Sequence, residues 1–272
     1  MSDLKTIDDI ILQYSTRGMT DLRKETKVDK FDDAATAVLS LEKGVIFLYT
    51  GFWVAGFAET DGPVGTYFLA LALEKIGFKP IIVTDIYCKD FFKEIKTLYV
   101  PVEIKKKDYF QDILKEYSPV CHISIERCGR GEDGCFRNHR GDDISSYTAK
   151  LDTLFELGSE EALSISVGDG GNEIGMGKYK DTLGKMGINY AVTPSKYSLI
   201  ASVSNWGAYG IIASLQKILH VKLLPAFEEA DDYLEYIVKL GSVDGISKKN
   251  IKSVDGKEWS LDEKILTQLK SI

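Results

Sequence analysis

Residues 163–178 of the chain read LSISVGDGGNEIGMGK, an apolar strand-like run followed directly by a glycine-rich segment. Because glycine has no Cβ, the backbone of such a segment can adopt left-handed conformations and approach a ligand closely. Asp169, Asn172 and Glu173 supply the hard oxygen ligands that Mg²⁺ and Mn²⁺ prefer. The stretch therefore predicts a strand that ends in a ligand-binding or metal-binding loop.

The glycine spacing excludes the two common nucleotide-binding loops. A G-x-G-x-x-G fingerprint that starts at Gly168 would need a glycine where Glu173 stands. A P-loop continues Gly-Lys with Ser or Thr, but Tyr179 follows Lys178. A strand-to-helix turn with solvated acids is the structural alternative to a binding loop.

Strand-like and helix-like segments alternate on both sides of this stretch. Helices are predicted over residues 4–14, 31–41, 64–76, 89–97, 145–157, 206–220 and 228–240, with a last helix from Leu261. Strands are predicted over residues 44–49, 80–83, 122–125, 163–167 and 190–192, and a hairpin over 251–259. Such alternation predicts a three-layer α/β fold, a mostly parallel sheet with helices on both faces. No repeat or linker interrupts it, so we expect a single domain over residues 1–272.

The predicted strands end in residues that can bind ligands. In open α/β sheets ligands bind outside the carboxyl ends of the strands. The residues at these ends are Thr50-Gly51, Thr84-Asp85, Glu126-Arg127, Gly168-Asp169 and Thr193. Their convergence predicts a site at this edge of the sheet.

Two carboxylates, Glu59 and Asp61, precede the predicted helix at 64–76. Capping of the helix N-terminus is the favoured role of Asp61 taken alone. A ligand role gains weight if the Gly168 loop lies beside it.

Three arginines could bind an anion. Arg127 and Arg130 follow Glu126 at a strand end, and Arg140 lies in a glycine-rich loop. Arginine holds carboxylate or phosphate through two parallel hydrogen bonds, although a structural ion pair explains Arg127 and Arg130 equally well. Ser204 and Asn205 begin a helix and either cap it or present free N–H groups to an anion.

Composition limits the partners. The formal net charge of −7 argues against nucleic acid or an anionic membrane as the main partner, but allows a small anionic substrate. No apolar run approaches the roughly 20 residues of a membrane span. The acidic N-terminal residues lack the pattern of a signal or transit peptide, so we expect a cytoplasmic location.

The four cysteines, Cys88, Cys121, Cys128 and Cys135, do not have the close pairing typical of a zinc site. Among the histidines, His139 is the weak candidate for an acid or base.

Several blocks together resemble the D-glutamate cyclase C-terminal-like family. They are Thr50-Gly51-Phe52, Glu59–Pro63, Glu126-Arg127 with Gly129-Arg130 and Asp133-Gly134, Arg140-Gly141 with Asp143-Ile144, Gly168–Lys178, Ser204–Gly207 and Val243-Asp244-Gly245. They follow the family order from about residue 44 to the C-terminus. The sequence departs from the family pattern at Cys128 and at 136–139.

The resemblance implies a lyase that converts D-glutamate to 5-oxo-D-proline and water with the help of Mn²⁺ or Mg²⁺. Its metal ligands would be Asp61, Glu126, Asp169, Asn172 and Glu173. Its catalytic residues would be Glu126, Asp169 and Glu173. Thr50, Arg127, Arg130, Arg140, Ser204 and Asn205 would bind the substrate.

Two other functions stay open at this point. The same acids could activate a metal-bound water in a manganese-dependent phosphatase acting on a small phosphate ester. The chain could also be a non-catalytic protein that binds a small anion. The sequence leaves both a monomer and a homo-oligomer open.

Overall fold

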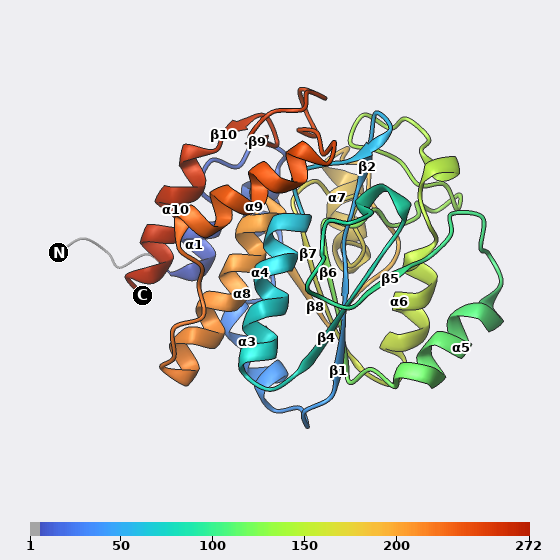
Figure 1. The fold of residues 1–272 in the computed structure, drawn as a ribbon. Helices are drawn as coiled ribbons and strands as arrows, with labels where there is room; N and C mark the ends of the chain where they lie inside the picture. The colour runs from blue at the N-terminus through green and yellow to red at the C-terminus, as the bar shows by residue number, and fades with distance from the viewer. Residues whose placement is uncertain (1–5) are drawn as a thin grey trace.

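The computed structural model describes residues 6–272. Its centre is a six-stranded sheet in the order β5-β4-β1-β6-β7-β8, in which all neighbouring strands are parallel (Figure 1). The strands are β1 (Val45–Tyr49), β4 (Lys79–Thr84), β5 (Thr97–Tyr99), β6 (Cys121–Ile125), β7 (Leu163–Gly168) and β8 (Tyr197–Ile200). The predicted α/β fold with a mostly parallel sheet is confirmed.

Helices cover both faces of the sheet because successive residues of a strand point to opposite faces. On β1, Ile46 and Leu48 pack in one apolar layer, whereas Phe47 and Tyr49 pack in the other. The first layer contains α3 (Phe31–Leu39), α4 (Pro63–Lys75) and α8 (Ser204–Leu219), and the second contains α5 (Lys107–Tyr117) and α6 (Leu151–Ser159). The predicted three-layer arrangement is confirmed.

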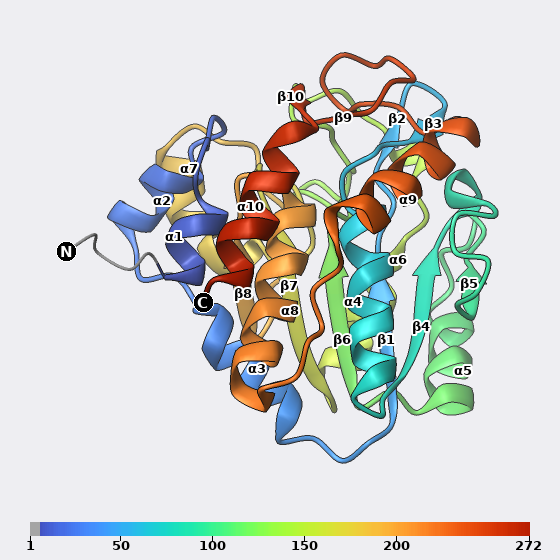
Figure 2. The same ribbon diagram turned by 60° about the vertical axis from the view of Figure 1, so that its left-hand side comes forward.

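The remaining elements lie around these layers. The helices are α1 (Ile7–Ile11), α2 (Met19–Glu25), α7 (Lys180–Lys185), α9 (Phe227–Lys239) and α10 (Ser260–Lys270), and the short strands are β2 (Trp53–Val54), β3 (Phe57–Ala58), β9 (Ser253–Val254) and β10 (Lys257–Glu258). Helices α1 and α10 pack together although they belong to opposite ends of the chain (Figure 2). The segments next to them can therefore meet at the same part of the molecule.

The predicted helix at 89–97 is wrong. A short 3₁₀ turn, Ile86–Cys88, is followed by turns and then by the edge strand β5. Asp90 has a left-handed backbone, with φ of 66°, which cannot continue a right-handed helix. Phe91 and Phe92 are buried in the core, so tertiary packing determines this segment.

The predicted strand at 190–192 is also wrong. The Val192 N–H donates to the Arg130 carbonyl oxygen at 2.9 Å, so this segment pairs with a loop instead of the sheet. The last strand of the sheet is β8, which pairs with β7. Thr193 therefore does not lie at a strand end, and its hydroxyl donates to Glu156 at 2.9 Å.

Most other predicted elements are present with shifted ends. Helix α1 covers part of the predicted 4–14, whose residues Leu4 and Lys5 lie outside the described residues. The predicted helix at 145–157 begins as a 3₁₀ turn, Ser145–Tyr147, and α6 starts at Leu151. Helices α2, α5 and α7 are additional to those predicted.

Within residues 6–272, no helix combines the length and apolar character needed to cross a membrane. The cytoplasmic location and the single domain stay predictions.

Candidate active site

Three neighbouring strands, β1, β6 and β7, bring acidic residues to the same edge of the sheet. The segment after β1 carries Glu59 and Asp61, Glu126 follows β6 directly, and the loop after β7 carries Asp169 and Glu173. The carboxyl ends of adjacent parallel strands lie side by side, so these carboxylates meet. The predicted convergence thus holds for three of the five expected strand ends.

A sixth carboxylate joins them from the hairpin β9–β10. We call Glu59, Asp61, Glu126, Asp169, Glu173 and Asp255 the acid centre. All six residues are buried. Carboxylate oxygens of Glu126, Asp169 and Glu173 lie within 4.8 Å of one another, and so do those of Asp61, Asp169 and Asp255.

Arg17, from the segment after α1, supplies a positive charge to the acid centre. Its Nη1 lies 3.0 Å from Asp169 Oδ1, and its Nη2 contacts the Asp255 carboxylate. One guanidinium cannot neutralise six buried carboxylates. Since an uncompensated buried charge is costly, the acid centre must take up protons or a further cation.

The pKa values of these carboxyl groups reflect this excess of negative charge. Burial raises the pKa of Asp61 to about 7, and the Asp255 carboxylate adds to the shift. Burial and then Glu173 raise the pKa of Glu126 well above its usual range. Burial likewise raises the pKa of Asp169, although Arg17 opposes the shift.

Asp61 caps α8, which is distant in sequence, instead of the adjacent helix α4. Its two carboxylate oxygens accept the N–H groups of Ser204, at 2.8 Å, and Asn205, at 2.7 Å. The Asn205 side-chain oxygen accepts the N–H groups of Gly62 and Gly65. The first N–H groups of α8 therefore bind a carboxylate of the protein, and Asn205 connects the starts of α4 and α8.

Glu126 lies at the end of β6 with a left-handed backbone, φ of 47°, which is unusual for a residue other than glycine. Ser204 Oγ donates to Glu126 Oε2 at 2.6 Å. Backbone strain of this kind persists where the surroundings fix a functional side chain. Ser204 therefore orients Glu126.

The glycine-rich loop holds Glu173 through its own backbone. The N–H groups of Gly170 and Gly171 each donate to a Glu173 oxygen at 2.8 Å. At Gly175, where φ is 97°, a Cβ would lie 1.7 Å from Ser166 Oγ, so the loop requires glycine there. Asn172 Nδ2 donates to the Arg137 carbonyl oxygen at 2.8 Å.

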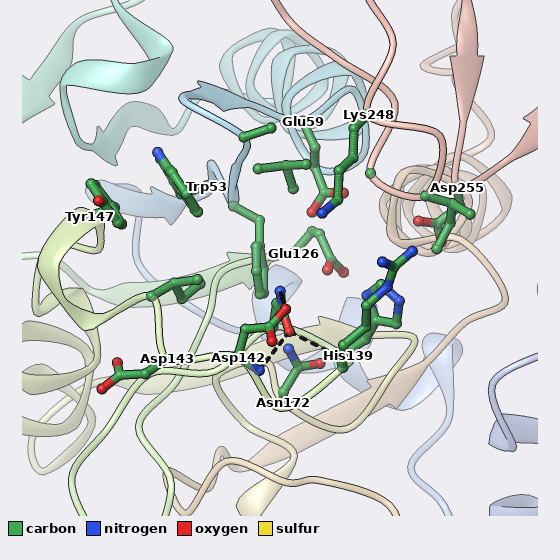
Figure 3. A pocket seen from close by; sticks show the side chains of 18 of the residues that line it. Trp53, Glu59, Glu126, His139, Asp142, Asp143, Tyr147, Asn172, Lys248 and Asp255 are labelled. Carbon is green, nitrogen blue, oxygen red and sulfur yellow. Dashed lines mark hydrogen bonds between the residues drawn. The ribbon is translucent and has the colours of Figure 1, made fainter.

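A cavity of about 290 Å³ opens beside the acid centre (Figure 3). Glu59, Glu126 and Asp255 line it, whereas Asp61, Asp169 and Glu173 lie beneath. Its volume is at the lower end of the range for small-molecule sites.

Basic and aromatic side chains complete the wall of the cavity. Arg140 and Lys248 both line it, and neither forms an ion pair with any of the residues 6–272. Trp53 stacks on Tyr147 with ring centroids 4.2 Å apart and an interplanar angle of 7°. The cavity thus offers both carboxylates and basic side chains without an ion pair, a combination that suits a zwitterion.

The loop 243–256 brings Lys248 and Asp255 to the cavity, and Asp244 organises this loop. The Asp244 carboxylate accepts the backbone N–H groups of three residues, at 3.1, 2.6 and 2.7 Å. At Gly245 a Cβ would lie 1.9 Å from Glu59 Oε2, so this glycine leaves room for the carboxylate.

Five of the six residues predicted to bind substrate do not line the cavity: Thr50, Arg127, Arg130, Ser204 and Asn205. Arg127 is fully buried, and its Nη2 lies 2.7 Å from Asp85 Oδ2 and donates to the Ala149 carbonyl oxygen at 2.9 Å. Arg127 therefore forms a structural ion pair, which was the alternative to substrate binding. Thr50 is also buried outside the cavity lining.

Arg130 lies in a different groove, where it pairs with Asp152 at 2.7 Å and Glu156 at 2.6 Å. Both acids come from α6, so Arg130 attaches its loop to that helix. Of the three arginines predicted to bind substrate, Arg140 lines the cavity.

Sequence reasoning missed Arg17, Lys248 and Asp255 as site residues. Asp255 precedes Gly256 and has the sequence of a hairpin turn, and its φ of 54° fits that role. Arg17 and Lys248 stand in short loops without a motif. The packing of α1 against α10 brings the segments that carry Arg17 and Asp255 to the acid centre.

The acid centre fits a divalent cation. Asp169 is 1% exposed; its Oδ1 pairs with Arg17, but its Oδ2 accepts no hydrogen bond from the residues described. A buried carboxylate oxygen without a partner is costly, whereas Mg²⁺ and Mn²⁺ prefer such oxygens.

Comparison with known proteins finds the same family that the sequence resembles. A sequence model described as D-glutamate cyclase-like, C-terminal, matches residues 7–270. The human protein D-glutamate cyclase, mitochondrial, is 37% identical over 100 residues, which are 34% of this chain and 16% of that protein. The chain therefore spans a small part of this relative.

Two solved structures are more distant. An exopolyphosphatase-related protein from Bacteroides fragilis is 11% identical, with a TM-score of 0.42 over 90% of this chain and 58% of the other. UDP-glucose 4-epimerase from Brucella ovis is 12% identical, with a TM-score of 0.29 over 66% of this chain and 49% of the other. Similarities at this level carry no argument about function.

Proposed function

Since the chain belongs to the D-glutamate cyclase-like, C-terminal family, we propose that it is a metal-dependent D-glutamate cyclase. The reaction converts D-glutamate to 5-oxo-D-proline and water. The observation that carries the proposal is the juxtaposition of the buried acid centre with a cavity that also has unpaired basic side chains.

The reaction forms one bond and breaks another. The substrate nitrogen attacks the γ-carboxyl carbon, and a carbon–oxygen bond of that carboxyl group breaks. The ammonium group loses two protons, and the departing oxygen gains two to leave as water. The site must therefore bind two carboxylates, accept protons from nitrogen and supply protons to oxygen.

Residues that line the cavity can meet these requirements. Arg140 and Lys248 would bind the substrate carboxylates, because each is a cation without an ion-pair partner among residues 6–272. Glu59 and Glu126 also line the cavity and would receive the ammonium group. Glu59, which is not among the proposed metal ligands, would take the amine proton.

The proposed divalent cation would be held by Glu126, Asp169 and Glu173, whose oxygens lie within 4.8 Å of one another. When bound, such an ion neutralises and polarises a carboxylate, which is otherwise a poor electrophile. Ser204 and the N–H groups of the glycine loop would orient Glu126 and Glu173 for this task.

A direct test incubates the protein with D-glutamate or L-glutamate in the presence of Mn²⁺, Mg²⁺ or EDTA and measures 5-oxoproline by chromatography. We expect product from the D-enantiomer with a divalent ion and none with EDTA. Asp169→Asn should weaken metal binding, whereas the exposed control Asp181→Asn should not. Unchanged metal affinity in folded Asp169→Asn would refute the ligand role.

The second candidate is a manganese-dependent phosphatase. It is favoured by one feature, the two carboxylate triads that share Asp169, since phosphatases commonly use two adjacent metal ions. Metal-dependent release of phosphate from a small phosphate ester, without 5-oxoproline from glutamate, would replace the cyclase proposal. Anion binding without either product would leave a non-catalytic binding protein.

A further inference from the structure

The acid centre has ligands for two cations. One triad consists of Glu126, Asp169 and Glu173, and the other of Asp61, Asp169 and Asp255. Asp169 belongs to both and is 1% exposed; its Oδ1 pairs with Arg17, and its Oδ2 accepts no hydrogen bond from the described residues. By ligand type alone, each triad could hold a divalent ion.

Arg17 distinguishes the two triads. Its guanidinium contacts Asp255, which belongs to the second triad alone, and Asp169, which belongs to both, so it touches two carboxylates of the second triad and one of the first. The Arg17 side chain is only 20% exposed. An arginine stays protonated under physiological conditions, so this charge is permanent. A divalent ion between Asp169 and Asp255 would lie next to this charge and be repelled by it.

We propose that Arg17 serves as the cation of the second triad, so that the protein binds a single divalent ion, at the first triad. Replacing Arg17 by an uncharged residue then opens a second metal site. This inference rests on the divalent ion of the proposed function.

The inference also bears on the choice between the two candidate reactions. Two-metal hydrolases hold the attacking and leaving oxygens between two ions. With Arg17 in place, the acid centre offers one ion and one guanidinium, which suits the polarisation of a single carboxylate. Arg17 therefore favours the cyclase over the phosphatase.

The test measures Mn²⁺ stoichiometry in metal-stripped, full-length protein by calorimetric titration. We expect one Mn²⁺ ion for the wild type and two for Arg17→Met. The conservative variant Arg17→Lys should keep one ion because it keeps the charge. Arg23→Met is the matched control, since Arg23 lies in the same N-terminal segment and pairs with Asp9, away from the acid centre; it should bind one ion.

Two further readouts separate this role from a structural one. Electron paramagnetic resonance should show isolated Mn²⁺ in the wild type and spin-coupled Mn²⁺ in Arg17→Met. Without metal, Arg17→Met should melt at a lower temperature than the wild type, and saturating Mn²⁺ should remove most of this difference. A merely structural arginine would lower the melting temperature equally with and without metal.

Two bound ions in the wild type, or one in folded Arg17→Met, overturn the proposal. If Arg17→Met does not fold, the wild type and Arg17→Lys still decide, because two ions in either one contradict it. Absence of Mn²⁺ binding in every variant refutes both this inference and the proposed metal dependence. One bound ion without 5-oxoproline refutes the cyclase activity alone.

Discussion

The raised pKa of Asp61 predicts an unusual dependence of stability on pH. In the folded protein this pKa is about 7, against 3.8 for the unperturbed group, because Asp61 is buried beside other carboxylates. The folded state therefore binds the proton more tightly than the unfolded state. This contribution to stability is complete below the unperturbed pKa and is lost as the pH rises through about 7.

The magnitude follows from the shift. The full shift corresponds to roughly 4 kcal/mol, and about 2 to 3 kcal/mol of this is lost between about pH 5 and about pH 8. His122 acts in the opposite direction, because burial lowers its pKa to about 3. Its contribution falls by about 2 kcal/mol when the pH is lowered over the same interval. The two effects nearly cancel in the wild type.

The variant Asp61→Asn separates the contributions of Asp61 and His122, because His122 titrates in both the variant and the wild type. The difference in unfolding free energy, variant minus wild type, should move in favour of the variant by about 2 to 3 kcal/mol between about pH 5 and about pH 8. Near pH 5 the variant should be the less stable protein, because an amide group cannot accept all the N–H groups that Asp61 accepts.

The assay is urea unfolding followed by circular dichroism, in EDTA, at several pH values. Repeating it with saturating Mn²⁺ should reduce the pH dependence, since a bound cation keeps the carboxylates ionised. A difference that stays constant within about 0.5 kcal/mol across this pH range in EDTA would show that Asp61 is charged throughout. That result would refute the account of the acid centre as short of positive charge.

Three other substitutions test the cavity. Gly245→Ala should displace the Glu59 carboxylate, because the new Cβ would lie 1.9 Å from Oε2, and should abolish 5-oxoproline formation in a folded protein; Gly131→Ala, with its nearest contact at 3.5 Å, should not. Lys248→Met should raise the KM for D-glutamate roughly fivefold with little change in kcat, as a partly exposed ion pair contributes about 1 kcal/mol; an unchanged KM would exclude Lys248 from substrate binding. Asp244→Ala leaves three backbone N–H groups without their acceptor and should cost about 2–4 kcal/mol in urea unfolding; a loss below about 1 kcal/mol would show that the loop holds its shape without it.

The alternation of apolar strands and amphipathic helices was sufficient to predict the layers. β1 is a short apolar run, and β7 alternates apolar residues with small serines; both are bounded by turn residues, and such short segments suit burial between two helical layers. Local patterns failed where distant contacts decide the conformation. Phe91 and Phe92 read as part of a helix but are held by the core, and 190–192 reads as a strand but pairs with loops.

Local sequence was sufficient to predict the glycine-rich loop after β7 and the acids Glu126, Asp169 and Glu173, because adjacent parallel strands present their carboxyl ends at one edge of the sheet. The charges that join these acids could be identified only in the folded chain. Arg127, at the end of β6, forms a buried ion pair with Asp85, whereas Arg17 and Asp255 reach the acid centre from segments near the two ends of the chain. The physical reason is that the strand period and sheet order are local properties, while the pairing of buried charges depends on which distant segments the core brings together.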